Sequence, residues 1–201
     1  MEMTTMVKVS PGNDKLGSIP NVSLLPIVTC DCRFPCAKRK NCYAWRFSRR
    51  PGVQKAWAHN TDLAMNQTTE FFRNLYYQLQ AQQPRRFRWH VGGDCPSLEY
   101  VREVFNIAEL CPETRFLIFS KRYKWITQVV DERNIPTNLS VKLSAWPGCK
   151  MHNPKNLPVA YMLDSRNPDP RIHTSVFPCL GTCKTCAVCW NQRDDVLFNK
   201  H

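Results

Sequence analysis

Apolar and polar positions change their periodicity several times along the chain, and these changes predict alternating strands and helices. Strands are predicted where apolar residues run together or alternate with polar ones, at 21–28, 85–91, 114–120, 139–146 and 158–164. Helices are predicted where apolar residues recur every three or four positions, at 53–65, 68–82, 98–111 and 123–132. Ser97 is a suitable N-cap for the third helix, and Pro112 ends it.

Strand, helix and strand follow one another in the order typical of right-handed βαβ crossovers, which build parallel sheets. We therefore expect an α/β fold of about five strands, either an open parallel sheet or a partial (β/α) barrel. Residues 1–178 are assigned to this domain, and residues 179–201 to a cysteine-rich C-terminal segment that binds metal and packs on it. In both architectures ligands collect at the carboxyl ends of strands, where candidate site residues should lie.

Composition narrows the class of protein further. The chain has eleven cysteines among 201 residues, an odd number that cannot pair completely within one chain. Its start lacks the apolar run of a secretion signal, and no segment approaches membrane-spanning length. We expect a cytoplasmic protein with no membrane partner. In the reducing cytoplasm, crowded thiols usually bind metal. The formal net charge of +12 favours polyanionic partners or anionic cofactors.

Two groups of four cysteines are the main candidates for metal ligands. One group follows the first predicted strand, and the other forms a C-x3-C-x2-C-x2-C run. Their members are Cys30, Cys32, Cys36 and Cys42, and then Cys179, Cys183, Cys186 and Cys189. Closely spaced thiolates suit a 4Fe-4S cluster, whereas zinc more often takes two separated pairs. Zinc stays open as an alternative metal, and so does the number of centres, one or two.

The remaining cysteines and the polar residues after the next strands carry weaker signals. Cys111 falls on the apolar stripe of a helix, where cysteine behaves as a small hydrophobic residue, while Cys95 and Cys149 stay unassigned. The polar candidates are His90, Gly92, Gly93, Asp94, Lys121 and Arg122. Glycines allow close backbone approach, a carboxylate pairs with an ammonium group, and neighbouring cations clamp an anion. The plainer alternatives are a hydrogen-bonded histidine, an aspartate that caps the next helix, and solvated cations.

Several segments, in this order, resemble the phage gene 88 protein family, a set of small proteins of unknown function. They are "NVSLLPIVTC", "CYAWR", "RWHVGGDCPSLEYV", "RFLIFSKR" and "CKTCAVCW", and the likeness covers about residues 18–190. That family in turn resembles radical S-adenosylmethionine proteins, whose partial barrel carries a three-cysteine cluster loop after its first strand. The likeness implies that Cys30 or Cys32, with Cys36 and Cys42, binds three irons of a cluster and leaves the fourth open.

The same likeness implies a site for S-adenosylmethionine at the carboxyl rim. Gly92, Gly93 and Asp94 would hold the amino group of this cofactor, with His90 beside them, and Lys121 or Arg122 would hold its carboxylate. Two features depart from the radical family: the gap between the second and third loop cysteines is wider, and aspartate stands in place of glutamate.

Basic residues gather in and after the cysteine loop, with aromatic residues between them. The candidates for nucleic-acid contacts are Lys38, Arg39, Lys40, Arg49 and Arg50. Cations for phosphates and rings for bases suit single-stranded nucleic acid. The plainer alternative is a solvated basic face whose aromatic residues turn into the core.

Taken together, these patterns predict an iron-sulfur protein of phage or mobile-element type, with one or two 4Fe-4S clusters. If it is an enzyme, the loop cluster would pass one electron to bound S-adenosylmethionine. The alternative is a non-catalytic metal-containing module in the host cytoplasm, which binds nucleic acid or inhibits a host protein through its basic surface. The sequence assigns neither a substrate nor an oligomeric state.

Overall fold

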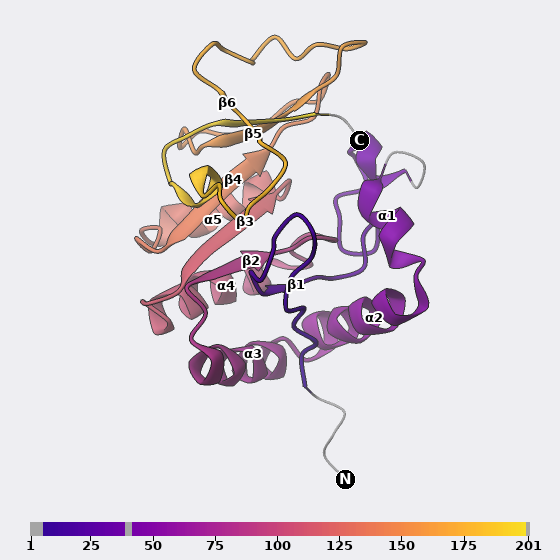
Figure 1. Ribbon diagram of the computed structural model, residues 1–201. Helices are drawn as coiled ribbons and strands as arrows, with labels where there is room; N and C mark the ends of the chain where they lie inside the picture. Colours follow the sequence, from indigo (N-terminus) through magenta and orange to yellow (C-terminus); the bar gives the residue numbers. More distant parts are fainter. Residues whose placement is uncertain (1–5, 39–41, 200–201) are drawn as a thin grey trace.

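The computed structural model describes residues 6–38 and 42–199 and arranges them around one sheet, as Figure 1 shows. Within these residues the sheet has seven strands, all parallel, in the order β1-β2-β3-β4-β5-β7-β6. The strands are β1 (Asn21–Val22), β2 (Arg86–Trp89), β3 (Arg115–Ser120), β4 (Leu139–Ser144), β5 (Val159–Leu163), β6 (Phe177–Pro178) and β7 (Val196–Asn199). Because β1 and β6 lie at its two edges, the sheet is open, which confirms an open parallel α/β fold.

Helices cover one face of the sheet. They are α2 (Pro51–Asn66), α3 (Thr68–Gln82), α4 (Leu98–Leu110) and α5 (Tyr123–Glu132), while the short α1 (Tyr43–Ser48) contacts α2. Apolar side chains of α2 to α5 form the main core with Phe87 and Trp89 of β2 and Phe116 of β3. None of these helices, in the part of the chain that is described, combines the length and apolar character needed to cross a lipid bilayer.

The opposite face of the sheet is covered by the chain between β6 and β7, which includes the short 3-10 helix η3 (Val188–Trp190). Side chains of β3 alternate between the two faces: Phe116 packs with the helices, while Leu117 packs with Trp190 and Cys183. Leu16, from the loop before β1, completes this smaller core. The N-terminal loop and the C-terminal segment therefore meet on the helix-free face.

Three features differ from the sequence prediction. The first strand covers only Asn21–Val22, because the apolar run continues into a turn at Pro26. A short helix, α1, follows the cysteine loop, and two strands, β6 and β7, come after the predicted last one. No strand is predicted within the segment 179–201, yet β7 lies in it and pairs with both β5 and β6 inside the sheet.

Candidate metal centres

The chain turns sharply between β1 and its first cysteine. Ile27 has a left-handed backbone conformation, with a φ of 74°, which is strained for a β-branched residue. Thr29 fastens the turn, since its hydroxyl donates to the Leu25 carbonyl (2.9 Å) and accepts from the Asp94 N–H (3.1 Å). The turn therefore brings Cys30 to the carboxyl end of β2.

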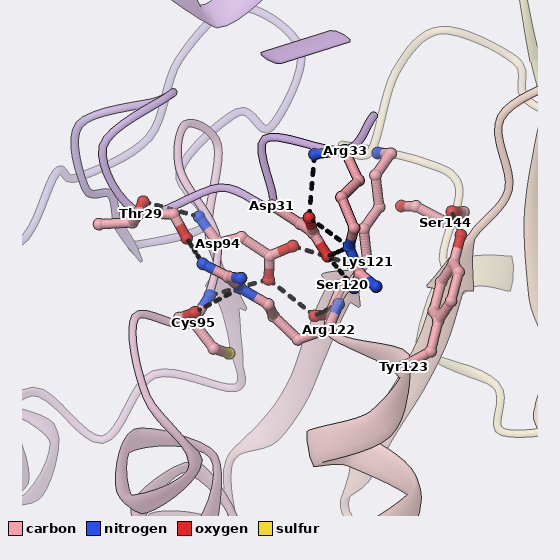
Figure 2. Close-up of polar contacts among 10 residues, drawn as sticks. All are labelled: Thr29, Asp31, Arg33, Asp94, Cys95, Ser120, Lys121, Arg122, Tyr123 and Ser144. Atoms are coloured by element: carbon pink, nitrogen blue, oxygen red, sulfur yellow. Dashed lines mark hydrogen bonds and ion pairs between the residues drawn. The ribbon is translucent and has the colours of Figure 1, made fainter. Parts of the chain in front are cut away.

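Arg122, which immediately precedes α5, ties this turn to the loop after β2 (Figure 2). Its Nη2 donates to the Thr29 carbonyl (2.6 Å) and its Nε donates to the Cys95 carbonyl (3.0 Å). The guanidinium also lies over the Trp125 ring, 4.5 Å from the centroid. The residue expected to hold an anion thus directs two of its donors at protein carbonyls.

Asp94 joins the ends of β2 and β3 (Figure 2). Its Oδ1 accepts from the Ser120 hydroxyl (2.7 Å) and the Cys95 N–H (2.8 Å), and its Oδ2 accepts from the Lys121 N–H (2.8 Å). Burial raises the pKa of this carboxyl, and the three donors oppose the rise. The cap of α4 is Ser97, so the alternative in which the aspartate caps that helix is wrong.

Three cysteines of the loop lie close enough to influence one another's ionisation; we call Cys30, Cys36 and Cys42 the loop thiols. Burial raises the pKa of Cys30 to about 12, and the charges of Asp94, Cys36 and Cys42 add to the increase. Burial also raises the pKa of Cys36, where the positive charge of Lys121 opposes it. Three sulfurs, one carboxylate and one ammonium group therefore share this rim.

Cys32 is exposed, beside Arg33. Arg33 donates from Nε to Asp31 Oδ1 (2.9 Å), which holds the turn between Cys30 and the short helix η1 (Pro35–Ala37). Of the two alternatives for the third loop ligand, Cys30 is the residue that neighbours Cys36 and Cys42.

The packing of the protein itself accounts for both glycines of the turn after β2. A Cβ at Gly92 would lie 2.4 Å from the Trp57 ring. Gly93 has a φ of 82°, and a Cβ there would lie 2.8 Å from both the Leu24 carbonyl oxygen and Thr29 Oγ1. Their small size is required whether or not a cofactor binds beside them.

His90 is a buried, hydrogen-bonded histidine. Its Nε2 lies 2.9 Å from the Tyr100 hydroxyl, and its Nδ1 has no partner among the described residues. Burial lowers the pKa of His90 to about 3, and the nearby charge of Arg88 acts in the same direction. The ring is therefore neutral near pH 7.

The C-terminal cysteines gather over β3 and β4 on the helix-free face. We call Cys179, Cys183, Cys186 and Cys189 the terminal thiols. Burial raises the pKa of Cys189 to about 11; Lys142 opposes this rise, while Cys179 and Cys183 add to it. Cys183 is influenced in turn by Cys179 and Cys186. The terminal thiols thus form a second group, with different charged neighbours from the loop thiols.

All eleven cysteines are free thiols. Cys95 and Cys111 are buried in the main core, and Cys149 packs at its edge, so Cys111 is the small hydrophobic residue that its helix predicted. Within residues 6–38 and 42–199, no three histidine, cysteine, aspartate or glutamate side chains form a group that could hold a metal ion as they stand.

Two cations beside the terminal thiols were missed by sequence reasoning. Lys142 is wholly buried in β4, and Arg88 of β2 has a buried Nε without a hydrogen-bond partner in the described chain. The only signal in the sequence is a lysine in the middle of the strand "LSVKLS".

The basic residues of the proposed nucleic-acid surface are only partly described. Lys38, Arg49 and Arg50 are exposed, whereas Arg39 and Lys40 lie outside the described residues. Phe47 is 47% exposed, and the Arg50 guanidinium lies 5.1 Å from its ring centroid. At least part of the aromatic set therefore faces outward, next to Arg49 and Arg50, which connect α1 to α2.

Comparison with known proteins gives one match. The model of the family described as Gene product 88 matches residues 4–174. The matched region includes the loop thiols and ends before the terminal thiols, whereas the resemblance read from the sequence extended to residue 190. No curated protein and no solved structure matches the chain.

Proposed function

The chain belongs to the Gene product 88 family, and we propose that it is an iron-sulfur protein whose cluster is held by the loop thiols. Residues 4–174 carry this family match, and Cys30, Cys36 and Cys42 all lie within it. The proposal assigns the three cysteines as cluster ligands and Lys121 as the cation that offsets their negative charge.

The observation that carries the proposal is the convergence of three thiols on one carboxylate and one ammonium group. The charges of Cys36, Cys42 and Asp94 all act on Cys30, and Lys121 acts on Cys36. Thiolates are the ligands that iron-sulfur clusters require, and they must lose their protons to bind metal. Thiols whose pKa is raised by burial stay protonated at neutral pH unless a metal cation replaces the proton.

The thiols of the loop are therefore suitable ligands for a cluster. Among the described residues no such group is already arranged to hold a metal, so the sulfurs must move closer together when the cluster binds. Such closure is expected, since metal ligands are rarely arranged before the metal binds. A bound cluster would supply one-electron chemistry at this rim. Thr29 and Arg122 would hold the base of the loop during closure.

The residues named for S-adenosylmethionine fit that cofactor less well. Asp94 already accepts three hydrogen bonds, and Arg122 donates to two backbone carbonyls. Gly92 and Gly93 are explained by contacts within the protein. The proposal therefore includes the cluster but not S-adenosylmethionine. It assigns Asp94, Arg122, Gly92 and Gly93 to holding the cysteine loop in place.

Metal analysis after anaerobic isolation tests the proposal. We expect iron and acid-labile sulfide in roughly equal amounts, about four of each for one cluster. Cys36→Ser should lose iron from the loop centre, whereas Cys32→Ser, which changes an exposed thiol four residues earlier, should keep it. An iron content that Cys36→Ser leaves at the wild-type level, or zinc in place of iron, contradicts the proposal.

A second candidate function is supported by the exposed face of α1. Tyr43 and Phe47 of α1 are exposed, as is Arg50 just before α2, and the Arg50 guanidinium lies over the Phe47 ring. Helix α1 and residues 25–28 line a pocket of about 460 Å³, with Trp45 and Arg49 in its wall. Rings and cations on one surface are the elements that bind single-stranded nucleic acid.

Binding isotherms with a single-stranded oligonucleotide at several salt concentrations test this candidate. Affinity should fall steeply with salt, and Arg49→Gln with Arg50→Gln should reduce the slope of log K against log salt by about 1–2. A matched control replaces Arg73 of α3 and Arg102 of α4, two arginines of other helices. An unchanged slope in the first variant excludes the surface around Arg49 and Arg50 as the binding site.

A further inference from the structure

We propose that the terminal thiols hold a second, separate metal centre, which fastens the N-terminal loop to the helix-free face of the sheet and is balanced by a buried lysine and a half-buried arginine. The proposal is independent of the loop centre. It concerns four cysteines that lie beyond the family match. The role proposed for this second metal centre is structural.

The backbone of the cysteine run is held by three different parts of the fold. Cys183 donates its N–H to the Lys15 carbonyl (2.7 Å), and Cys179 donates its N–H to the Leu197 carbonyl (2.8 Å). The Cys189 carbonyl accepts from the Ser140 hydroxyl (2.8 Å). Four sulfurs on a backbone anchored in this way would link the N-terminal loop, β4 and β7 through one centre.

The contact with the N-terminal loop is close. Gly17 has a φ of 66°, and a Cβ there would lie 2.6 Å from the side chain of Lys184. Leu16 is buried between this loop and the run, together with Cys183 and Trp190. The loop therefore lies directly on the segment that carries the sulfurs, so a metal there would order both.

A buried lysine supplies an observation that does not depend on the cysteines. Lys142 is wholly buried, and its Nζ donates to the carbonyls of Asn191 (2.8 Å) and Asp194 (2.7 Å). Both acceptors are uncharged, and no ion pair joins Lys142 to a carboxylate within the described residues. A buried ammonium group that forms no direct ion pair is costly. The largest favourable electrostatic influence on it comes from Cys189, ahead of Asp194 and Asp195.

Arg88 is a second cation at the same place. Its guanidinium lies 5.0 Å from the Phe119 centroid, its Nε is buried without a partner in the described chain, and its charge acts on Cys183 and Cys189. Four thiolates around a divalent metal carry a net charge of about −2, which balances both cations. A four-thiolate iron-sulfur cluster would also be anionic, so the charge argument holds for either metal.

The tests use the full chain with Cys30, Cys36 and Cys42 changed to serine, and separately with the four terminal cysteines changed to serine. Iron and zinc are measured in each folded variant. The loop variant should retain about four irons or about one zinc per chain at the terminal centre. If it retains none, or if the terminal variant keeps the full wild-type metal content, the second centre does not exist. If the loop variant keeps the full wild-type metal content, the loop holds no metal, and only the proposal of a loop centre is contradicted.

A charge variant tests the role of the buried cation without changing any ligand. Lys142→Gln keeps a hydrogen-bond donor for the two carbonyls and removes the charge; Lys124→Gln, on the exposed face of α5, is its control. In the loop-serine background, Lys142→Gln should lose metal to a chelator about 10- to 100-fold faster, as expected for a group that supports the ligands. Release at the rate of the Lys124→Gln control would overturn the proposal.

Discussion

Replacing Gly93 by alanine tests whether the turn after β2 is fixed by the packing of the protein. Gly93 has a φ of 82°, and an alanine with this backbone costs about 1–2 kcal/mol. Its Cβ would lie 2.8 Å from the Leu24 carbonyl oxygen and from Thr29 Oγ1. Relieving such crowding costs about 1–3 kcal/mol. Alanine also restricts the unfolded chain, which offsets about 0.4–1 kcal/mol, so the free energy of unfolding should fall by roughly 1–5 kcal/mol.

Two other glycines provide matched controls. Gly148 has a φ of 75°, and the nearest atom to an added Cβ, Nδ2 of Asn167, is at an ordinary distance of 3.5 Å. Gly148→Ala therefore carries the backbone cost alone, about 1 kcal/mol. Gly52 lies in the first turn of α2 with no atom within 4 Å of an added Cβ. Gly52→Ala should be neutral or stabilise the protein by up to about 1 kcal/mol.

Urea unfolding of the full chain, followed by far-ultraviolet circular dichroism, measures the series. All variants are isolated anaerobically and compared at the same metal content, because bound metal adds to stability. The expected order of stability is Gly52→Ala, wild type, Gly148→Ala and then Gly93→Ala. If Gly93→Ala is no less stable than Gly148→Ala, crowding against Leu24 does not fix the turn. A ligand requirement would then again be a reason for the glycine.

Three further predictions concern the same rim and the helix behind it. The unfolded chain binds a proton at His90 below about pH 6.5, and the folded chain only near pH 3. Stability should therefore fall as pH drops through this window, by about 1.4 kcal/mol per pH unit, and His90→Gln should flatten the slope in urea unfolding. Ser97→Ala removes an acceptor for the Tyr100 N–H, and should cost about 1 kcal/mol by the same assay. Arg122→Met removes the hydrogen bonds to the carbonyls of Thr29 and Cys95. The variant should show faster proteolysis of the cysteine loop and a lower iron content per chain than the wild type.

Helices and central strands could be predicted because their signals are local. The segment 98–111 has a serine cap and a stripe of apolar residues, and α4 begins at the predicted residue and ends one residue earlier, at Leu110. The segment 123–132 matches α5 residue for residue. The first strand was overestimated because "LLPIV" is apolar throughout, yet proline lacks an N–H and Ile27 has a positive φ. The proline was the available signal for an early end of the strand.

The meeting of strand ends could also be predicted, but the partners of each side chain could not. Parallel strands place their carboxyl ends on one rim, and the structure joins Asp94 after β2 to Ser120 and Lys121 at the end of β3. The resemblance to radical S-adenosylmethionine proteins assigned the aspartate to the amino group of a cofactor. Which donors bind the Asp94 carboxylate depends on strand register and on the path of the next loop. Local periodicity predicts neither.

The burial of Lys142 is a second feature that local sequence patterns could not predict. Alternation in "LSVKLS" correctly places Leu139, Val141 and Leu143 toward the helices, where they join the main core. On an ordinary antiparallel sheet the other face would meet water, and a serine and a lysine there would need no explanation. Here a segment about fifty residues further along the chain covers that face and brings two carbonyls and a thiol to the lysine. A charged residue inside a strand of a parallel sheet, which is normally covered on both sides, therefore indicates a polar or anionic cover. In this chain the later segment that supplies the cover is also the one richest in cysteine.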